Sequence, residues 1–169
     1  MAKQTRKINR LQGYDYSQNG AYFVTICVKN HECILGEITD GDEKNVGETC
    51  GLPNIIIFEY GKIIEDEIQK IPNYYHSEVI VEKYIIMPNH VHMIIRLDNS
   101  GANGRPQVSP TIPRIMQQFK GKITKQLGFS IWQRSYHDHI IRNEKEYEKI
   151  WQYIDTNAFK WNDDIYYKI

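Results

Sequence analysis

Two apolar runs joined by the dipeptide Pro88-Asn89 constrain the fold of this chain more than any other feature. Residues 77–87 and 90–97 are rich in β-branched residues, and proline followed by asparagine is a turn signal. Both runs are therefore predicted to be strands that pair through this turn. A third run, residues 21–28, is predicted to be a central strand, and Asn19-Gly20 marks its start.

Three helices are predicted from apolar residues that recur at helical spacing. They cover residues 53–69, 111–127 and about 144–157. The last helix has a capping signal, because Asn143 is followed three residues later by Glu146.

The remaining segments complete the order of the elements. Residues 132–142 are predicted to be a strand and residues 33–38 a short partner strand, whereas residues 39–53 and 98–110 are predicted loops. The resulting β-α-β-β-α-β order with a C-terminal helix matches a ferredoxin-like split βαβ sandwich. We therefore expect an α+β fold with an antiparallel sheet and helices on one face, as a single domain over residues 1–169.

Composition limits the classes of function. The net charge is zero, so a nucleic-acid partner requires a local basic surface, and Lys3, Arg6, Lys7 and Arg10 offer one. The alternative for these four residues is a frayed, solvated terminus. No apolar run approaches the ~18 residues that span a membrane, so no membrane partner is expected. The three cysteines fit no zinc motif, and we expect reduced thiols and a cytoplasmic location.

Two histidines alternate along the strand after Pro88-Asn89. His90 and His92 therefore point to one face of the sheet, and Val91 points to the other face and into the core. Two neutral imidazoles on one face can hold a divalent cation. The alternative is a pair of surface histidines that flank a core valine.

The last helix carries a second candidate. Tyr153 and Asn157 lie one turn apart on one helix face. A tyrosine is a nucleophile when a cation or base assists loss of its proton, and the amide oxygen of asparagine is a suitable ligand for Mg²⁺ or Mn²⁺. The alternative is a tyrosine that only packs.

A third candidate is a surface for nucleic acid. Residues 132–142 mix aromatic, basic and imidazole groups that can stack on bases and contact phosphates, although an amphipathic edge strand explains them too. The candidate DNA contacts are Arg6, Lys7, Arg10, Arg114, Lys120, Lys122, Lys125, Arg134, Tyr136, His139 and Arg142.

Together these motifs resemble the REP-associated tyrosine transposases and the single-tyrosine insertion-sequence transposases, over about residues 8–163. The matching segments are Tyr14-Asp15-Tyr16, Ala21-Tyr22-Phe23-Val24-Thr25, Met87-Pro88-Asn89-His90-Val91-His92, Phe119-Lys120, Ile131-Trp132-Gln133-Arg134-Ser135-Tyr136, Asp138-His139-Ile140-Ile141-Arg142, and Tyr153-Ile154 with Asn157.

The resemblance assigns roles to residues of this chain. It implies that His90 and His92 are metal ligands, that Asn157 is a further ligand, and that Tyr153 is the nucleophile. It also implies that Mg²⁺ or Mn²⁺ is the cofactor and that hairpin-containing single-stranded DNA is the partner. The DNA is cleaved through a 5′-phosphotyrosine bond that leaves a free 3′-hydroxyl, and the strand is then rejoined. One departure is Asn157-Ala158, where the family has Asn-Pro, and it weakens the expected helix stop.

Alternatives stay open at this stage. A domesticated DNA-binding protein with little catalysis, or a metal-dependent hydrolase without a covalent step, would use parts of the same site. Tyr147 is a second tyrosine on the last helix, but it is rotated by roughly 120° from Tyr153 and should face elsewhere. The resemblance also leaves a homodimer open, because insertion-sequence relatives are dimers with shared active sites whereas REP-associated members can be monomeric.

Overall fold

The computed structural model describes residues 13–39, 53–75, 78–98, 100 and 110–164. Its centre is a four-stranded antiparallel sheet with the order β4-β5-β1-β6. The strands are β1 (Gly20–Cys27), β4 (Val79–Met87), β5 (His90–Leu97) and β6 (His137–Ile141). β1 therefore lies between β5 and β6, and the element order is that of the split βαβ fold. The predicted α+β class is confirmed.

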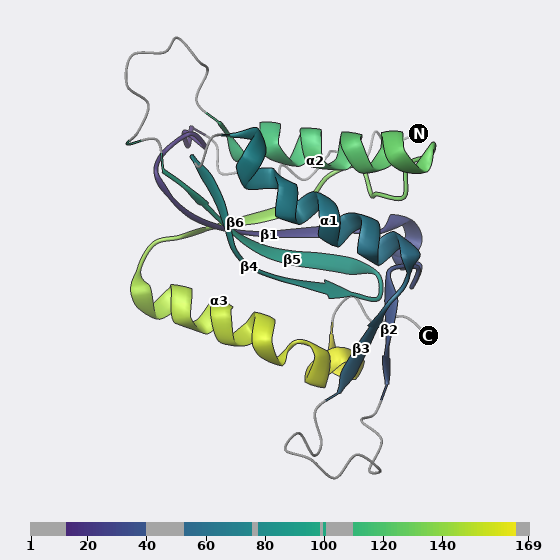
Figure 1. Cartoon of the computed structure of the whole chain (residues 1–169). Helices are drawn as coiled ribbons and strands as arrows, with labels where there is room; N and C mark the ends of the chain where they lie inside the picture. The colour runs from purple at the N-terminus through teal and green to yellow at the C-terminus, as the bar shows by residue number, and fades with distance from the viewer. Residues whose placement is uncertain (1–12, 40–52, 76–77, 99, 101–109, 165–169) are drawn as a thin grey trace, which may run out of the picture.

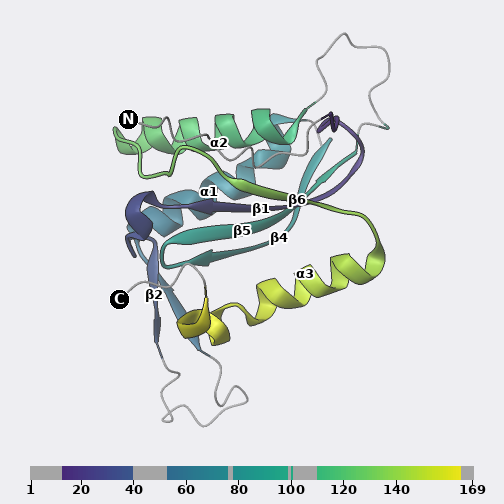
Figure 2. The ribbon, with the colours of Figure 1, turned by 180° about the vertical axis from the view of Figure 1, so that it is seen from behind.

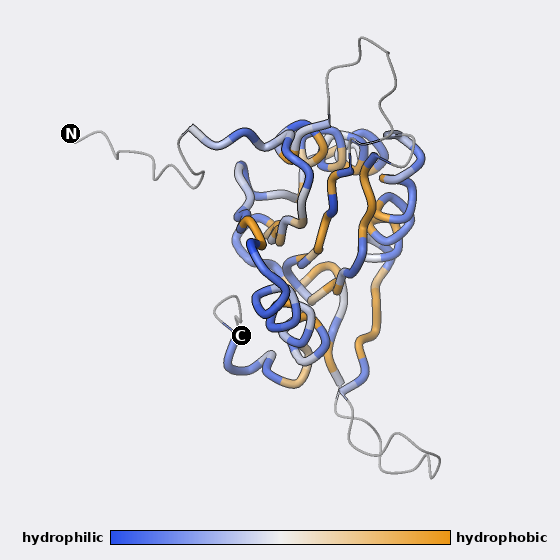
Figure 3. Tube along the Cα trace, turned by 90° about the vertical axis from the view of Figure 1, so that its left-hand side faces the viewer, coloured by the Kyte–Doolittle hydropathy of each residue, from blue (hydrophilic) through white to orange (hydrophobic). Residues whose placement is uncertain are grey.

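Helices cover both faces of this sheet. α1 (Glu59–Tyr74) and α2 (Ile112–Leu127) lie on one face, and α3 (Glu144–Thr156) lies on the other (Figures 1 and 2). Strand residues therefore alternate between two apolar layers, and the strands are orange along much of their length in Figure 3. Val24 and Val91 belong to the main core with α1 and α2, whereas Ile94 packs with Ile154 of α3.

Local signals explain where two helices begin and end. The hydroxyl of Thr111 accepts a hydrogen bond from the backbone N–H of Arg114 at the start of α2. Gly128, with φ of 80°, ends that helix in the left-handed conformation. At the start of α3 the Asn143 side chain accepts from the N–H of Glu146 at 2.9 Å, as the sequence predicts.

The prediction for residues 53–69 was partly wrong. The helix there is α1, which begins only at Glu59 and continues to Tyr74, with Pro72 in its last turn. The residues before it form β3 (Asn54–Ile57), which pairs with β2 (Gly36–Thr39) in a separate two-stranded sheet (Figure 1). The segment predicted over 33–38 is thus not a partner of the central strand. An isoleucine run favours a strand once another strand pairs with it.

The strand predicted over residues 132–142 is shorter than expected. Trp132 makes only an isolated bridge, and the regular strand β6 begins at His137. The ammonium group of Lys120 donates to the backbone carbonyl groups of Gln133 and Ser135. These two carbonyl groups are therefore hydrogen-bonded to a side chain and not to a neighbouring strand.

Parts of two predicted loops fall outside the described residues, namely 40–52 of the first and 99 and 101–109 of the second. Within the part of the chain that the structure describes, no helix has both the length and the apolar character needed to cross a bilayer.

Candidate metal centre and active site

The register of the central sheet brings both histidines of β5 under α3. His92 lies opposite Thr25 of β1, and His90 lies opposite Cys27. Val91 between them points to the other face and is fully buried in the main core, as predicted. Both imidazoles are buried, with exposed fractions of 0% for His90 and 1% for His92. The two rings are therefore part of the interior between the sheet and α3, not a surface pair.

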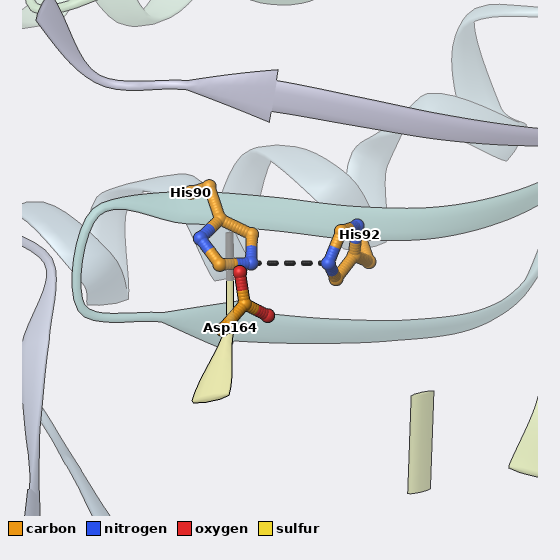
Figure 4. A group of neighbouring side chains, drawn as sticks. All are labelled: His90, His92 and Asp164. Carbon is orange, nitrogen blue, oxygen red and sulfur yellow. Dashed lines mark hydrogen bonds between the residues drawn. The ribbon is translucent and has the colours of Figure 1, made fainter. Parts of the chain in front are cut away.

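The two imidazoles converge on one another and on a carboxylate. The Nε2 atoms of His90 and His92 lie 3.0 Å apart, and a carboxylate oxygen of Asp164 completes a group whose ligand atoms all lie within 4.8 Å (Figure 4). Two imidazoles and a carboxylate form a ligand set for a divalent cation. Asp164 reaches the histidines because the 3₁₀ segment η2 (Ala158–Asp163) follows α3 and turns the chain.

Asn157 lies beside this group at the end of α3. Its amide nitrogen donates to Asp164 Oδ2 at 3.0 Å, and its side-chain oxygen is buried without a hydrogen-bond partner among the described residues. An unpaired buried carbonyl oxygen is costly. Coordination of a cation would satisfy the side-chain oxygen of Asn157. The residues present therefore fit a bound metal ion. The predicted ligand role of Asn157 remains a prediction.

Tyr153 is in contact with one of these histidines, His92. Its hydroxyl lies 3.2 Å from Nε2 of His92, and its ring packs edge-on against Phe23 with centroids 6.0 Å apart. Phe23 also stacks on His92, with centroids 5.1 Å apart. Tyr153 retains 38% of its exposure, so a substrate can approach a phenol that touches the candidate metal group.

Burial sets the protonation of these groups. It lowers the pKa of His90 to about 4, although the charge of Asp164 opposes this shift. Burial and the neighbouring His90 lower the pKa of His92. Both imidazoles are thus neutral near pH 7, as metal ligation requires. Burial raises the pKa of Tyr153, Asp164 adds to the rise, and a hydrogen bond from Asn157 opposes it, so the phenol keeps its proton without a cation.

Two Haemophilus influenzae proteins and one solved structure are similar to this chain. The chain is 32% identical to an uncharacterized protein of Haemophilus influenzae over 96% of its own length and 93% of that protein. It is 28% identical to a Haemophilus influenzae protein named "Putative REP-associated tyrosine transposase", over 44% of this chain and 47% of that one. A solved REP-associated tyrosine transposase bound to a REP hairpin has the same fold. Its TM-score is 0.59 at 20% identity, over 89% of this chain and 73% of that one.

The chain is therefore similar to REP-associated tyrosine transposases in part of its sequence and in its fold. No protein-family model matches it. The fold expected from the sequence motifs is thus confirmed, and so is the resemblance to REP-associated tyrosine transposases.

The second tyrosine of α3, Tyr147, contacts β4 and β5 and not the metal group. The hydroxyl of Tyr147 donates to Glu82 of β4 at 3.0 Å, and its ring lies beside the Arg96 guanidinium, 5.7 Å from the ring centroid. Further along the helix, Lys83 forms an ion pair with Asp155. Tyr147 therefore faces away from the histidines, as predicted, and helps to hold α3 on the sheet.

The predicted DNA contacts do not form one cluster around the metal group. Arg6, Lys7 and Arg10 lie outside the described residues. The cations of α2 lie on the face of the sheet opposite to α3 (Figure 1). The exposed predicted contacts are Arg114, Lys122, Lys125, Arg134, His139 and Arg142.

Several of the predicted side chains are engaged within the protein, among them His139, whose Nε2 lies 2.7 Å from Glu146 Oε1. Lys120 donates to the backbone carbonyl groups of Gln133 and Ser135, and Tyr136 is buried with 8% exposure. Lys122 lies 3.5 Å from the ring centroid of Tyr74 and 3.9 Å from a carboxylate oxygen of Glu67. Lys120 and Tyr136 therefore stabilise the fold.

β6 adds imidazoles on the face that carries the site. His137 lies opposite Thr25 and His139 opposite Phe23, and directly opposed residues of antiparallel strands project to the same face. Both histidines are exposed. His137 was not among the predicted contacts, although its alternation with His139 in the sequence is the same signal that identified His90 and His92.

Proposed function

We propose that this chain cleaves and rejoins single-stranded DNA next to a hairpin, through a covalent bond between Tyr153 and a 5′ phosphate. The observation that carries the proposal is the 3.2 Å contact between the Tyr153 hydroxyl and His92 Nε2, because it joins a nucleophile to a metal-capable group. The relative that was solved with a REP hairpin supports the class of substrate.

His90, His92 and Asp164 are the proposed ligands of a divalent cation, and Asn157 is proposed to add its side-chain oxygen. Oxygen ligands suit Mg²⁺, and the combination of imidazole with oxygen also suits Mn²⁺. Bound there, either ion supplies positive charge that favours the phenolate and polarises the scissile phosphate.

The chemical step is a transesterification. The phenolic oxygen of Tyr153 bonds to phosphorus, the bond between phosphorus and the 3′ oxygen breaks, and the 5′ phosphate becomes esterified to the tyrosine. The phenol loses one proton and the departing 3′ oxygen gains one, so the proton balance is zero. Attack by a 3′-hydroxyl reverses the step and needs no ATP, because a phosphate ester is exchanged for another phosphate ester. Tyr153 is 38% exposed, so part of the side chain that carries this oxygen is open to solvent in the folded chain.

DNA contacts are proposed for the exposed cations of the described chain, above all Arg134 and Arg142 on either side of β6, and for the N-terminal Arg6, Lys7 and Arg10. His137 and His139 lie between the first two on the face of the site, and they are further candidates for contact with a strand that reaches Tyr153.

The proposal is tested with a DNA hairpin that carries a labelled single-stranded flank. With Mn²⁺, a denaturing gel should show a fragment that ends in a 3′-hydroxyl and a second fragment that migrates with the protein. Excess EDTA should abolish both. A free 5′-phosphate fragment with no adduct would instead support a metal-dependent hydrolase. Hairpin binding without any cleavage would support a DNA-binding protein that does no chemistry.

A further inference from the structure

The side chain of Asn89 has a defined orientation because one of its partners can only accept. Its amide nitrogen donates to the backbone carbonyl oxygen of His31 at 3.1 Å. Its amide oxygen consequently faces the imidazole of His90, 2.8 Å from Nδ1. An amide oxygen accepts and never donates, so Nδ1 of His90 must carry the proton. The neutral ring then presents a lone pair at Nε2, toward the candidate metal site.

Thr25 makes the corresponding contact to the other histidine. Its hydroxyl oxygen lies 2.8 Å from Nδ1 of His92, its cross-strand partner. A hydroxyl both donates and accepts, so Thr25 can serve His92 with the proton on either ring nitrogen. The two histidines therefore differ: the neighbour of His90 permits one tautomer, and the neighbour of His92 permits two.

The short distance between the Nε2 atoms of His90 and His92 explains why His92 needs both tautomers. Their Nε2 atoms lie 3.0 Å apart, and two lone pairs at that distance repel. Since His90 offers a lone pair, His92 donates from Nε2 when no cation is present, with the Tyr153 hydroxyl oxygen, 3.2 Å from that nitrogen, as a second acceptor. Thr25 then donates to Nδ1 of His92. A cation requires a lone pair at Nε2 of both rings. The His92 proton must then leave Nε2 and one must be taken up at Nδ1, where Thr25 accepts it, with no net change in protonation.

We propose that Asn89 and Thr25 are positioning residues that control the proton positions of the metal ligands. Asn89 holds His90 in the ligating tautomer at all times, and Thr25 lets His92 change tautomer when a cation binds. This inference rests on the proposed metal centre. Both side chains are buried, with exposed fractions of 0% and 3%, so bulk water does not replace either contact. Loss of such an outer partner typically weakens metal affinity by about 10–100-fold.

A matched pair of variants at one position tests the role of Thr25. Thr25→Val keeps the shape and removes the hydroxyl, whereas Thr25→Ser keeps the hydroxyl. The full chain is titrated with Mn²⁺, and free Mn²⁺ is measured by electron paramagnetic resonance. Thr25→Val should bind about 10–100-fold more weakly than wild type, and Thr25→Ser within about threefold. Hairpin affinity in EDTA should be equal in all three proteins. Equal Mn²⁺ affinity in Thr25→Val would overturn the role of Thr25 while leaving the metal centre in place. Failure of the wild type to bind Mn²⁺ would instead overturn the proposed metal centre itself.

The tautomers can be read in the wild-type protein, so the test does not depend on whether a variant folds. Two-bond ¹H–¹⁵N correlation spectra distinguish a proton on Nδ1 from one on Nε2. His90 should carry its proton on Nδ1 both in EDTA and in saturating Mg²⁺. His92 should change from Nε2–H to Nδ1–H when Mg²⁺ is added. A proton on Nε2 of His90 in EDTA would overturn the role of Asn89, and an unchanged His92 tautomer under saturating Mg²⁺ would overturn that of Thr25.

Discussion

Asp164 adds a negative charge to the candidate metal site that the two histidines lack. Neutral imidazoles bring no negative charge to a cation, and both rings are buried where an uncompensated charge is costly. The carboxylate of Asp164 supplies the missing charge, and the amide of Asn157 holds one of its oxygens. We therefore expect Asp164 to matter as much for metal affinity as the histidines.

The charge of Asp164 can be removed with almost no change in shape. Asp164→Asn should weaken Mn²⁺ binding by roughly tenfold or more, because the number of charged ligands tunes affinity at such sites. Asp163→Asn is the matched control, since it removes the same charge one residue earlier at an exposed position. Calorimetric titration of both variants with Mn²⁺ gives the comparison. Equal losses in the two variants would mean that only the general charge of this segment matters.

His90 makes the stability of the metal-free protein depend on pH. Its pKa is about 4 in the folded chain and near 6.5 in an unfolded chain, so between these values only the unfolded chain takes up the proton. This contribution to stability is complete above about pH 6.5 and is lost as the pH falls toward 4. In EDTA, the urea midpoint should therefore fall more between pH 7 and pH 5 for wild type than for His90→Gln. His137→Gln, at an exposed position on β6, is the control. An equal fall in wild type and His90→Gln would show that His90 is not the source.

α3 is the element that brings the nucleophile to the metal group. Ile154, next to Tyr153, is 1% exposed and packs on the sheet with Ala21 and Ile94. The ion pair between Lys83 and Asp155 supports the same helix from its more exposed side. The position of Tyr153 therefore depends mainly on apolar packing of the helix.

Ile154→Ala measures that packing. The removed methylene groups and the cavity should lower the free energy of unfolding by about 2–5 kcal/mol. Gln152→Ala, at an exposed position on the same helix, should change it by less than about 0.5 kcal/mol. Urea denaturation in EDTA provides both values. A change below about 1 kcal/mol in Ile154→Ala would mean that α3 is only loosely held.

Elements with local signals could be predicted from the sequence, and those without could not. The Pro88-Asn89 turn between β4 and β5 and the N-terminal cap of α3 depend on neighbouring residues, and they were predicted correctly. β3 was predicted to be helical because its isoleucines fit both periods, and its strand state depends on pairing with a distant segment.

The residues of the candidate site also differ in whether a local sequence signal indicates them. Periodicity along one strand and one helix placed His90, His92, Tyr153 and Asn157 correctly on their faces, and the fold brings those faces together. Asp164 had no such signal. It follows a six-residue 3₁₀ segment, where no apolar period indicates which way the side chain points.

The whole molecule has three layers, with the site between the sheet and α3, and with α2 on the opposite face of the sheet (Figure 2). A hairpin that reaches Tyr153 would therefore meet charges near β6 before those of α2. Arg134 and Arg142 flank β6 and are exposed.

The N-terminal cations test how DNA is bound. Replacing Arg6, Lys7 and Arg10 together with alanine should weaken hairpin binding several-fold. It should also reduce the slope of log affinity against log salt by roughly one unit for each phosphate that the protein no longer neutralises. The control replaces Lys62 and Lys70, exposed on α1, with alanine. Fluorescence anisotropy at several salt concentrations gives the slopes. An unchanged affinity and slope in the triple variant would mean that the N-terminal segment does not bind DNA.

Covalent attachment of DNA to Tyr153 is the step on which the proposed function depends, and mapping the adduct tests it. The protein is incubated with labelled hairpin DNA and Mn²⁺, adducts are separated on a denaturing gel, and the modified peptide is identified by mass spectrometry.

Phenylalanine at position 153 keeps the ring that packs on Phe23 and removes the attacking oxygen. Tyr153→Phe should therefore fold, bind the hairpin and form no adduct, whereas Tyr147→Phe should form the adduct at most of the wild-type level, because Tyr147 contacts Glu82 away from the histidines. In the wild type the DNA should be attached to the peptide that contains Tyr153. An adduct on Tyr147, or undiminished cleavage by Tyr153→Phe, would contradict the proposed mechanism.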